Sequence, residues 1–186
     1  MLAILSPAKT LDYQTPLTVK KSTQPDFNAE SSELVSTLRK FAPGQIGSLM
    51  KISDSLAELN HRRYAEWQAD ANEDNARAAI FAFKGDVYQG LDAQSLGARD
   101  LNFAQKHLRV LSGLHGLLRP LDLIQPYRLE MGTRLTTRHG SNLYQFWGDK
   151  VTNNINRALA QQTSKVLVNL ASNEYYKVVQ PARIMG

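Results

Sequence analysis

The sequence predicts an α/β protein in which a central mixed sheet is covered by helices. Short apolar segments alternate along the 186 residues with longer segments whose apolar residues recur at helical spacing. The composition agrees, because 42% of the residues are hydrophobic and 21% are charged, as is usual for a globular protein. At roughly 150 residues per domain, the chain is expected to form one domain over residues 1–186.

Five segments are predicted to be strands. Four of them are short apolar runs that end at Pro, Gly or polar residues, and the fifth lies in an arginine-rich region. The predicted strands are residues 2–5, 78–83, 108–111, 128–134 and 166–170.

Five helices are predicted around these strands. Ser53 and Ser172 are good N-cap residues for two of them, and Pro43-Gly44 is expected to end the first. The longest has Leu143, Trp147 and Val151 on its inner face. The predicted helices are residues 30–41, 54–67, 93–106, 142–161 and 172–179, and residues 12–27 are expected to form an extended surface loop.

The positive charge of the chain is concentrated in one window. The net charge is +5, and residues 99–138 contain seven lysines and arginines against three acidic residues. Residues 52–98 contain four basic residues against eight acidic ones. A focused basic surface suggests a polyanionic partner, although a solvated surface that is merely basic remains the alternative.

A pair of glycines in this window is the first candidate site. Gly113 and Gly116 flank His115 in the sequence LSGLHGLLR, residues 111–119, and suit a tight hairpin. A helix-hairpin-helix-like element would grip the DNA backbone here, and a plain strand-to-helix turn is the other interpretation. The candidate nucleic-acid-binding residues are Gly113, His115, Gly116, Arg119, Arg128 and Arg134.

Polar residues at the predicted strand ends form a second candidate site. Ser6 and Lys9 follow the first strand, and Glu174 and Tyr175 follow the last. In α/β sheets, ligands gather at the carboxyl ends of the strands, and an acid, a phenol and an amine could transfer protons there. Each of these residues also has a simpler structural interpretation.

Several classes of site and location are not indicated by the sequence. The chain has no cysteine, which removes disulfides, thiolate metal sites and thiol-based peroxide sensing. Its four histidines lack metal-ligand spacing, and nothing indicates a cofactor or a particular protein partner. Because no segment resembles a signal peptide or a membrane span, we expect a cytoplasmic protein without a membrane association.

Five motifs in order along the chain resemble the signature blocks of the peroxide stress protein YaaA family. They span almost the whole sequence, which makes them more specific together than any one alone. The motifs are SPAKTLD (residues 6–12), GDVYQGL (85–91), LSGLHGLLRPLD (111–122), PYRLEMGT (126–133) and LASNEY (170–175).

The resemblance implies a function as well as a fold. It implies a mixed α/β fold with a helix-hairpin-helix element beside a basic cleft, DNA binding, and a role in limiting oxidative damage and intracellular iron. With the hairpin at residues 111–119, Arg128 and Arg134 become cleft residues. Family members normally continue beyond Gly186, so the chain is expected to lack a C-terminal portion.

Two functions therefore follow from the sequence. The first is DNA binding in the peroxide stress response, with recognition of DNA structure rather than base sequence. The alternative is an enzyme acting on a nucleotide or on a base in DNA. Its candidate catalytic residues are Ser6, Lys9, Glu174 and Tyr175.

Overall fold

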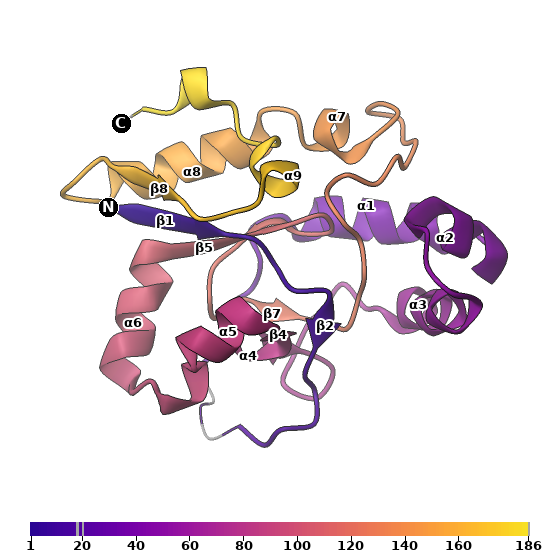
Figure 1. The fold of residues 1–186 in the computed structure, drawn as a ribbon, viewed down its shortest axis with the longest axis horizontal. Helices are drawn as coiled ribbons and strands as arrows, with labels where there is room; N and C mark the ends of the chain where they lie inside the picture. The colour runs from indigo at the N-terminus through magenta and orange to yellow at the C-terminus, as the bar shows by residue number, and fades with distance from the viewer. Residues whose placement is uncertain (18, 20, 186) are drawn as a thin grey trace.

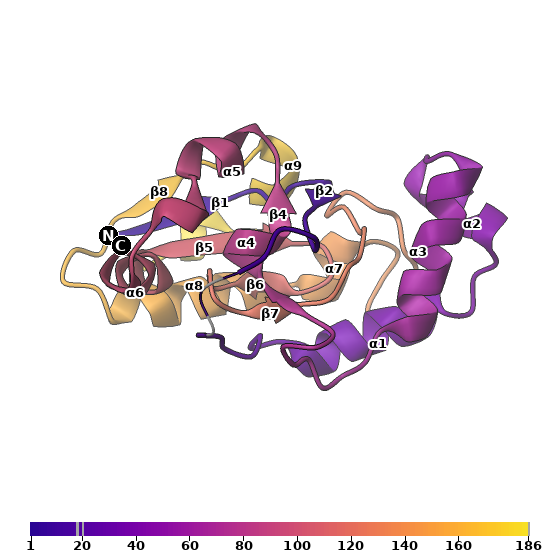
Figure 2. The same cartoon turned by 90° about the horizontal axis from the view of Figure 1, so that it is seen from below.

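A mixed sheet lies at the centre of the molecule in the computed structural model, which describes residues 1–17, 19 and 21–185. The strand order is β6-β5-β1-β8 (Figure 1, with β6 labelled in Figure 2). Central β1 (Leu2–Leu5) runs parallel to β5 (Leu108–Ser112) and β8 (Leu167–Asn169), and β6 (Gly116–Leu118) is antiparallel to β5. The predicted α/β class with a mixed sheet is confirmed.

Helices surround this sheet and also extend to one side of it. Helix α6 packs on β1 and β5, while α8 packs on β6. Figure 2 shows α2 and α3 side by side at the end of the molecule away from α6. The α-helices are α1 (Asn28–Leu38), α2 (Pro43–Met50), α3 (Asp54–Glu66), α4 (Ala79–Ala82), α5 (Asp86–Leu91), α6 (Ala98–His107), α7 (Leu143–Trp147), α8 (Lys150–Ala160) and α9 (Asn173–Tyr176); short 3₁₀ turns are Ala93–Ser95 and Pro181–Arg183.

Two apolar clusters stabilise the fold. The larger one joins the central strands to α1, α3, α7 and α8, and Trp147 is its largest fully buried side chain. The smaller one lies between α4 and α6, where Phe81 and Leu101 are buried. Among the described residues, none of the helices has both the length and the apolar character needed to cross a membrane.

The predicted strand 78–83 is wrong in part. β3 (Arg77–Ala78) pairs with β7 (Leu123–Ile124), and β4 (Phe83–Lys84) pairs with β2 (Thr10–Leu11). Between β3 and β4 lies α4, a single helical turn whose residues are all buried. A buried turn and a buried strand are both continuously apolar, so the pattern alone could not separate them.

Several helix boundaries differ from the prediction: the predicted helix 93–106, for example, is a 3₁₀ turn followed by α6. Pro43 does not end a helix but begins α2, consistent with the preference of proline for the first helical turn. The predicted helix 142–161 is divided into α7 and α8 at Gly148, whose φ of 47° is left-handed. The predicted inner face is nevertheless correct, since Leu143, Trp147 and Val151 are all buried.

Of the two remaining predicted strands, one is wrong and the other is confirmed. Residues 128–134 contain no strand, because their backbone bonds locally and to side chains: Thr133 N donates to Glu130 O. Residues 166–170 do form a strand, but β8 is at the sheet edge, with Val166 53% and Leu170 63% exposed.

Candidate functional site

The predicted strand-end residues meet at one edge of the sheet. Because β1, β5 and β8 are parallel, their carboxyl ends lie on the same side. Ser6 follows β1 and accepts a hydrogen bond from the backbone N–H of Ser172, which precedes α9 (N···O 2.9 Å). Their hydroxyl oxygens are 3.3 Å apart. Segments 166 residues apart in sequence are thereby joined.

An arginine, a lysine and one carboxylate lie beside this junction. Lys9 Nζ is 3.3 Å from Glu130 Oε1, and Arg128 Nη2 is 2.8 Å from the same oxygen. Lys9 is mostly exposed, whereas Arg128 is half-buried and its Nε has no hydrogen-bond partner among the described residues. The Lys9–Glu130 pair joins the irregular segment 128–134 to the residues that follow β1.

Glu174 attaches the same segment from the other side. Its Oε1 accepts from the backbone N–H of Gly132 at 2.9 Å, and a Cβ on Gly132 would lie 2.9 Å from that oxygen. Tyr144 also donates to the backbone oxygen of Glu174 at 2.9 Å. The Glu174 carboxylate thus satisfies a backbone donor, and a side chain at position 132 would push this carboxylate aside.

Tyr175 is buried beneath this cluster. Burial is the main cause that raises the pKa of its phenol, so the hydroxyl stays protonated. Together with Lys9, Arg128 and Glu130 it lines a cavity of about 20 Å³, about the size that one water needs. The structure therefore gathers Ser6, Lys9, Glu174 and Tyr175 at one edge, around very little internal space.

The glycine hairpin is buried and is flanked by strands. Gly113, His115 and Gly116 connect β5 to β6, so residues 111–119 are a β-hairpin and not a helix-hairpin-helix element. A Cβ on Gly113 would overlap the carbonyl of Leu129. Gly116 has a φ of 65° and lies against the ring of Trp147. These glycines serve close packing, which explains their spacing without a ligand.

His115 is part of the interior. Its Nδ1 lies 3.0 Å from Ser31 Oγ, and its backbone N–H donates to Ser112 Oγ at 2.9 Å. The ring packs edge-on to Tyr127 at 5.3 Å. Burial lowers the pKa of His115 to about 3, so the imidazole is neutral at physiological pH and adds no positive charge.

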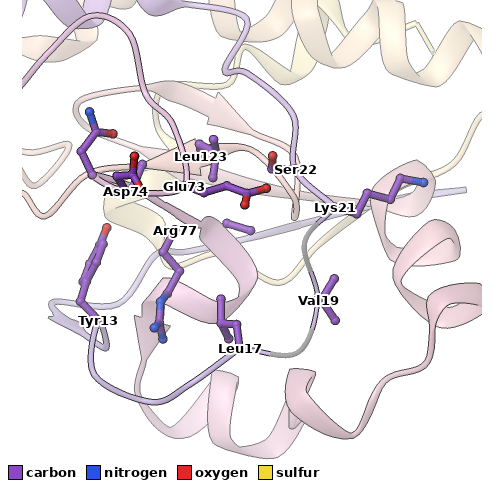
Figure 3. Close-up of a pocket in the computed structure, with 12 residues that line it drawn as sticks. Tyr13, Leu17, Val19, Lys21, Ser22, Glu73, Asp74, Arg77 and Leu123 are labelled. Carbon is purple, nitrogen blue, oxygen red and sulfur yellow. The ribbon is translucent and has the colours of Figure 1, made fainter.

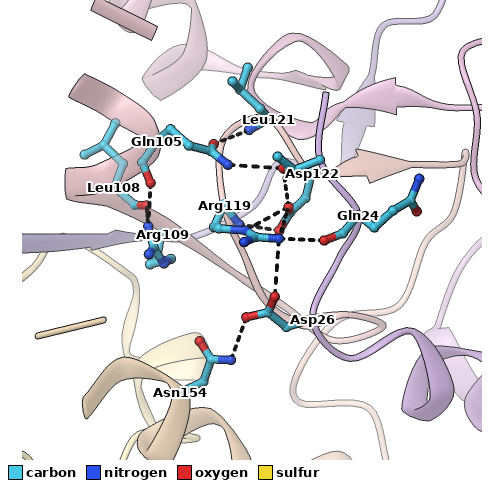
Figure 4. Close-up of polar contacts among 10 residues, drawn as sticks. Gln24, Asp26, Gln105, Leu108, Arg109, Arg119, Leu121, Asp122 and Asn154 are labelled. Carbon is cyan, nitrogen blue, oxygen red and sulfur yellow. Dashed lines mark hydrogen bonds and ion pairs between the residues drawn. The ribbon is translucent and has the colours of Figure 1, made fainter. Parts of the chain in front are cut away.

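Arg119 is held by two carboxylates. Its Nη2 lies 3.0 Å from Asp122 and 3.3 Å from Asp26 (Figure 4). The same group donates to the carbonyl of Gln24 at 2.6 Å. Arg134, by contrast, is exposed and takes part in no ion pair within the described part of the chain. Of the six predicted nucleic-acid contacts, only Arg134 presents an unpaired, exposed charge.

A helical hairpin that the sequence reasoning missed lies elsewhere. α2 and α3 pack together, so that a Cβ on Gly47 would be 3.4 Å from the Cβ of Ala57. Residues 51–53 connect them, and Lys51 has a left-handed φ of 54°. Pro43 at a helix start, followed ten residues later by Ser53 as an N-cap, was the available sequence signal.

The start of α3 is open to solvent. The Ser53 side chain does not accept from the first-turn amides and lies instead 3.1 Å from Ser55 Oγ. Asp54 and Ser55 are exposed. A helix begins with N–H groups that have no partner inside the helix, so these donors are available to an acceptor outside.

A further cavity, of about 450 Å³, lies beside Arg77 (Figure 3). Arg77 donates to the carbonyl of Thr15 at 2.7 Å and lies over the ring of Tyr13. Glu73 and Asp74 also line this space, so its charges are mixed. Across residues 1–17, 19 and 21–185, no group of three or more His, Asp or Glu side chains is placed to hold a metal ion.

Comparison with known protein families agrees with the motif pattern. A family described as "Peroxide stress protein YaaA" matches this chain over residues 1–186.

Proposed function

Because the chain belongs to the peroxide stress protein YaaA family, we propose that it serves the oxidative stress response by binding DNA. The proposed contact surface is the α2–α3 hairpin, defined as residues 43–66, and the phosphate backbone is the proposed ligand. Backbone contacts carry no base information, so the protein would recognise DNA structure rather than sequence. We place this activity in the cytoplasm.

The open start of α3 is the observation that carries the proposal. Unpaired N–H groups and the positive end of the helix dipole favour an anion at this position. α3 is 13 residues long, and its first turn is exposed and not capped by a side chain. Lys51, in the three-residue connection between α2 and α3, is exposed and takes part in no ion pair among the described residues.

Further basic side chains lie just after α1 and near the end of α3. Lys40, Arg62 and Arg63 are at least partly exposed, and no ion pair in the described ranges includes them. The Tyr64 hydroxyl donates to the carbonyl of Arg128, which brings the basic segment containing Arg134 beside α3. These basic side chains would supply separate phosphate contacts, beside the exposed acids Asp54, Glu58 and Glu66 of the same helix.

Replacing Lys51 with glycine tests this surface cleanly. Glycine accepts the left-handed φ of 54° more readily than lysine, so Lys51→Gly removes the charge without straining the turn. We expect the variant to bind duplex and bubble DNA several-fold more weakly than the parent chain at low salt. Arg99→Gln on α6, which also removes one positive charge, is the control and is expected to bind as the parent chain does. Fluorescence anisotropy with labelled oligonucleotides measures both. Equal affinity of Lys51→Gly and the parent chain would contradict the proposed surface.

A second candidate function is catalysis at the strand-end edge, and it rests on the gathering of Ser6, Lys9, Glu174 and Tyr175. Glu174→Gln keeps an oxygen that can accept from Gly132 but removes the acid. If this edge is catalytic, the variant loses product formation from lesion-containing oligonucleotides or nucleotides and retains its DNA affinity. Absence of product from every substrate with the parent chain would contradict catalysis.

That the protein limits the intracellular iron content is a separate proposal. It is tested by measuring the iron content of peroxide-stressed cells with and without the protein. An unchanged iron content would contradict it.

A further inference from the structure

A cavity of about 680 Å³ lies at the amino-terminal end of the central strands, opposite the strand-end edge. It is formed where α6 meets β5 and where α8 ends. Of the described residues that line it, none is acidic, and three are Lys106, Arg109 and Arg119. Amide side chains of Gln105, Gln161 and Gln162 form part of its wall.

Arg109 is the central cation of this cavity. It is the second residue of β5, paired with Ile4 of β1, so the sheet fixes its backbone. Its Nη1 donates to the carbonyls of Gln105 at 2.9 Å and Leu108 at 2.7 Å. Its other two guanidinium nitrogens make no hydrogen bond to the described residues, and they are not sealed from solvent. They are therefore available to a ligand in the cavity.

Arg109 takes part in no ion pair within the described structure. Asp26 and Asp122 are the nearby carboxylates, and both form ion pairs with Arg119 (Figure 4). Burial and then the like charge of Arg119 lower the pKa of Arg109, while Asp122 and Asp26 raise it in part. Because both carboxylates are bound by Arg119, the two guanidinium nitrogens of half-buried Arg109 that lack a partner favour an anionic ligand.

The walls of the cavity are held by further hydrogen bonds. Gln105 Oε1 accepts from the backbone N–H of Leu121 at 2.8 Å, and its Nε2 donates to Thr23 at 3.1 Å. Gln162 Nε2 donates to the carbonyl of Lys106 at 2.9 Å. These contacts fix the walls around Arg109 before a ligand arrives, which lowers the entropic cost of binding.

We propose that this cavity binds a phosphoryl group, either as inorganic phosphate or as the terminal phosphate of a small nucleotide. The planar guanidinium of Arg109 offers two donors to phosphate oxygens, and exposed Lys106 adds a second charge. The site is separate from the proposed DNA surface, because α6 and the start of β1 lie at the opposite end of the molecule from α2 and α3 in both Figure 1 and Figure 2.

Isothermal titration calorimetry of the whole chain with inorganic phosphate, ADP and adenosine tests the proposal. We expect phosphate or ADP to bind and adenosine not to bind. Tighter binding of ADP than of phosphate would identify a nucleotide as the source of the phosphoryl group, and equal binding would identify free phosphate. Failure of both phosphate and ADP to bind at millimolar concentration overturns the proposal.

Substitutions locate the binding within the molecule. Loss of a charged hydrogen-bond donor predicts that Arg109→Gln weakens binding about tenfold or more. Lys106→Gln, at an exposed position that does not threaten folding, is expected to weaken it several-fold, and Arg157→Gln on the exposed face of α8 is the unchanged control. Unaltered affinity in both cavity variants overturns the assignment. Displacement of bound ADP by duplex DNA also overturns it, because the cavity is proposed to be separate from the DNA surface.

Discussion

At the scale of single residues, the glycines and the histidine of the β5–β6 hairpin act through packing. Gly113 lies under the carbonyl of Leu129, and Gly116 lies against Trp147. Trp147 Nε1 also donates to the carbonyl of Gly113 at 3.0 Å. The hairpin is therefore the point at which α7 and the segment 128–134 meet the sheet, and its role is to position those elements.

Gly113→Ala is predicted to destabilise the protein strongly. The new Cβ would overlap backbone atoms, which cannot move aside as a flexible side chain can, and overpacking of this kind costs about 1–3 kcal/mol or more. Gly44→Ala is the matched control, because nothing lies within 4 Å of the position of its Cβ; in helix α2 it should stabilise the protein by up to about 1 kcal/mol. Urea unfolding measures both, and a Gly113→Ala change below about 0.5 kcal/mol would contradict the packing role.

His115 predicts how stability depends on pH. Its pKa is about 3 in the folded protein and about 6.5 when unfolded, so the unfolded chain binds the extra proton between these values. The contribution of neutral His115 to the free energy of unfolding is complete above pH 6.5 and is lost as the pH falls towards 3. Between pH 6 and 4, the free energy of unfolding should fall by about 1.4 kcal/mol per pH unit more than in His115→Gln. Parallel pH profiles of the two proteins would show that His115 is not buried and neutral.

At the scale of elements, the sequence patterns predicted where strands lie along the chain better than they predicted which segments are buried. The apolar runs at 2–5 and 166–170 correctly predicted the strands β1 and β8. Because these strands pair in parallel, Ser6 and Ser172 meet at one edge. The burial of the 113–116 hairpin was not predictable, because a glycine pair suits both a ligand loop and a packed turn. Asp122, three residues after Arg119, was the sequence hint that this arginine is already paired.

Asp54 in the first turn of α3 gives a prediction for the α2–α3 hairpin. Its carboxylate favours the helix dipole but repels a phosphate at the same place. Asp54→Asn should therefore strengthen DNA binding several-fold while lowering the free energy of unfolding by about 0.3–1 kcal/mol. Anisotropy titrations and urea unfolding together measure the two effects. Weaker DNA binding by Asp54→Asn would argue against phosphate contact at this helix start.

At the scale of the whole molecule, three surfaces with different chemistry are kept apart. The strand-end edge joins β1, α9 and the segment 128–134, where Glu130 and Glu174 satisfy the nearby donors. The opposite end of the same strands contains the Arg109 cavity, and the α2–α3 hairpin lies to one side (Figure 1). The basic side chains behind the net charge of +5 thus fall into two groups. Some form ion pairs, and others lie on surfaces where they are unpaired in the described structure.

The central claim, DNA backbone binding by the α2–α3 hairpin, is tested most directly by the salt dependence of affinity. The logarithm of the binding constant for duplex DNA should fall linearly with the logarithm of the salt concentration, because bound cations displace counterions. Lys51→Gly should reduce the steepness of that line by about one unit, the effect of losing one phosphate contact, and Arg99→Gln should leave it unchanged. Affinity that is independent of salt, or an identical slope in Lys51→Gly and the parent chain, would contradict the account.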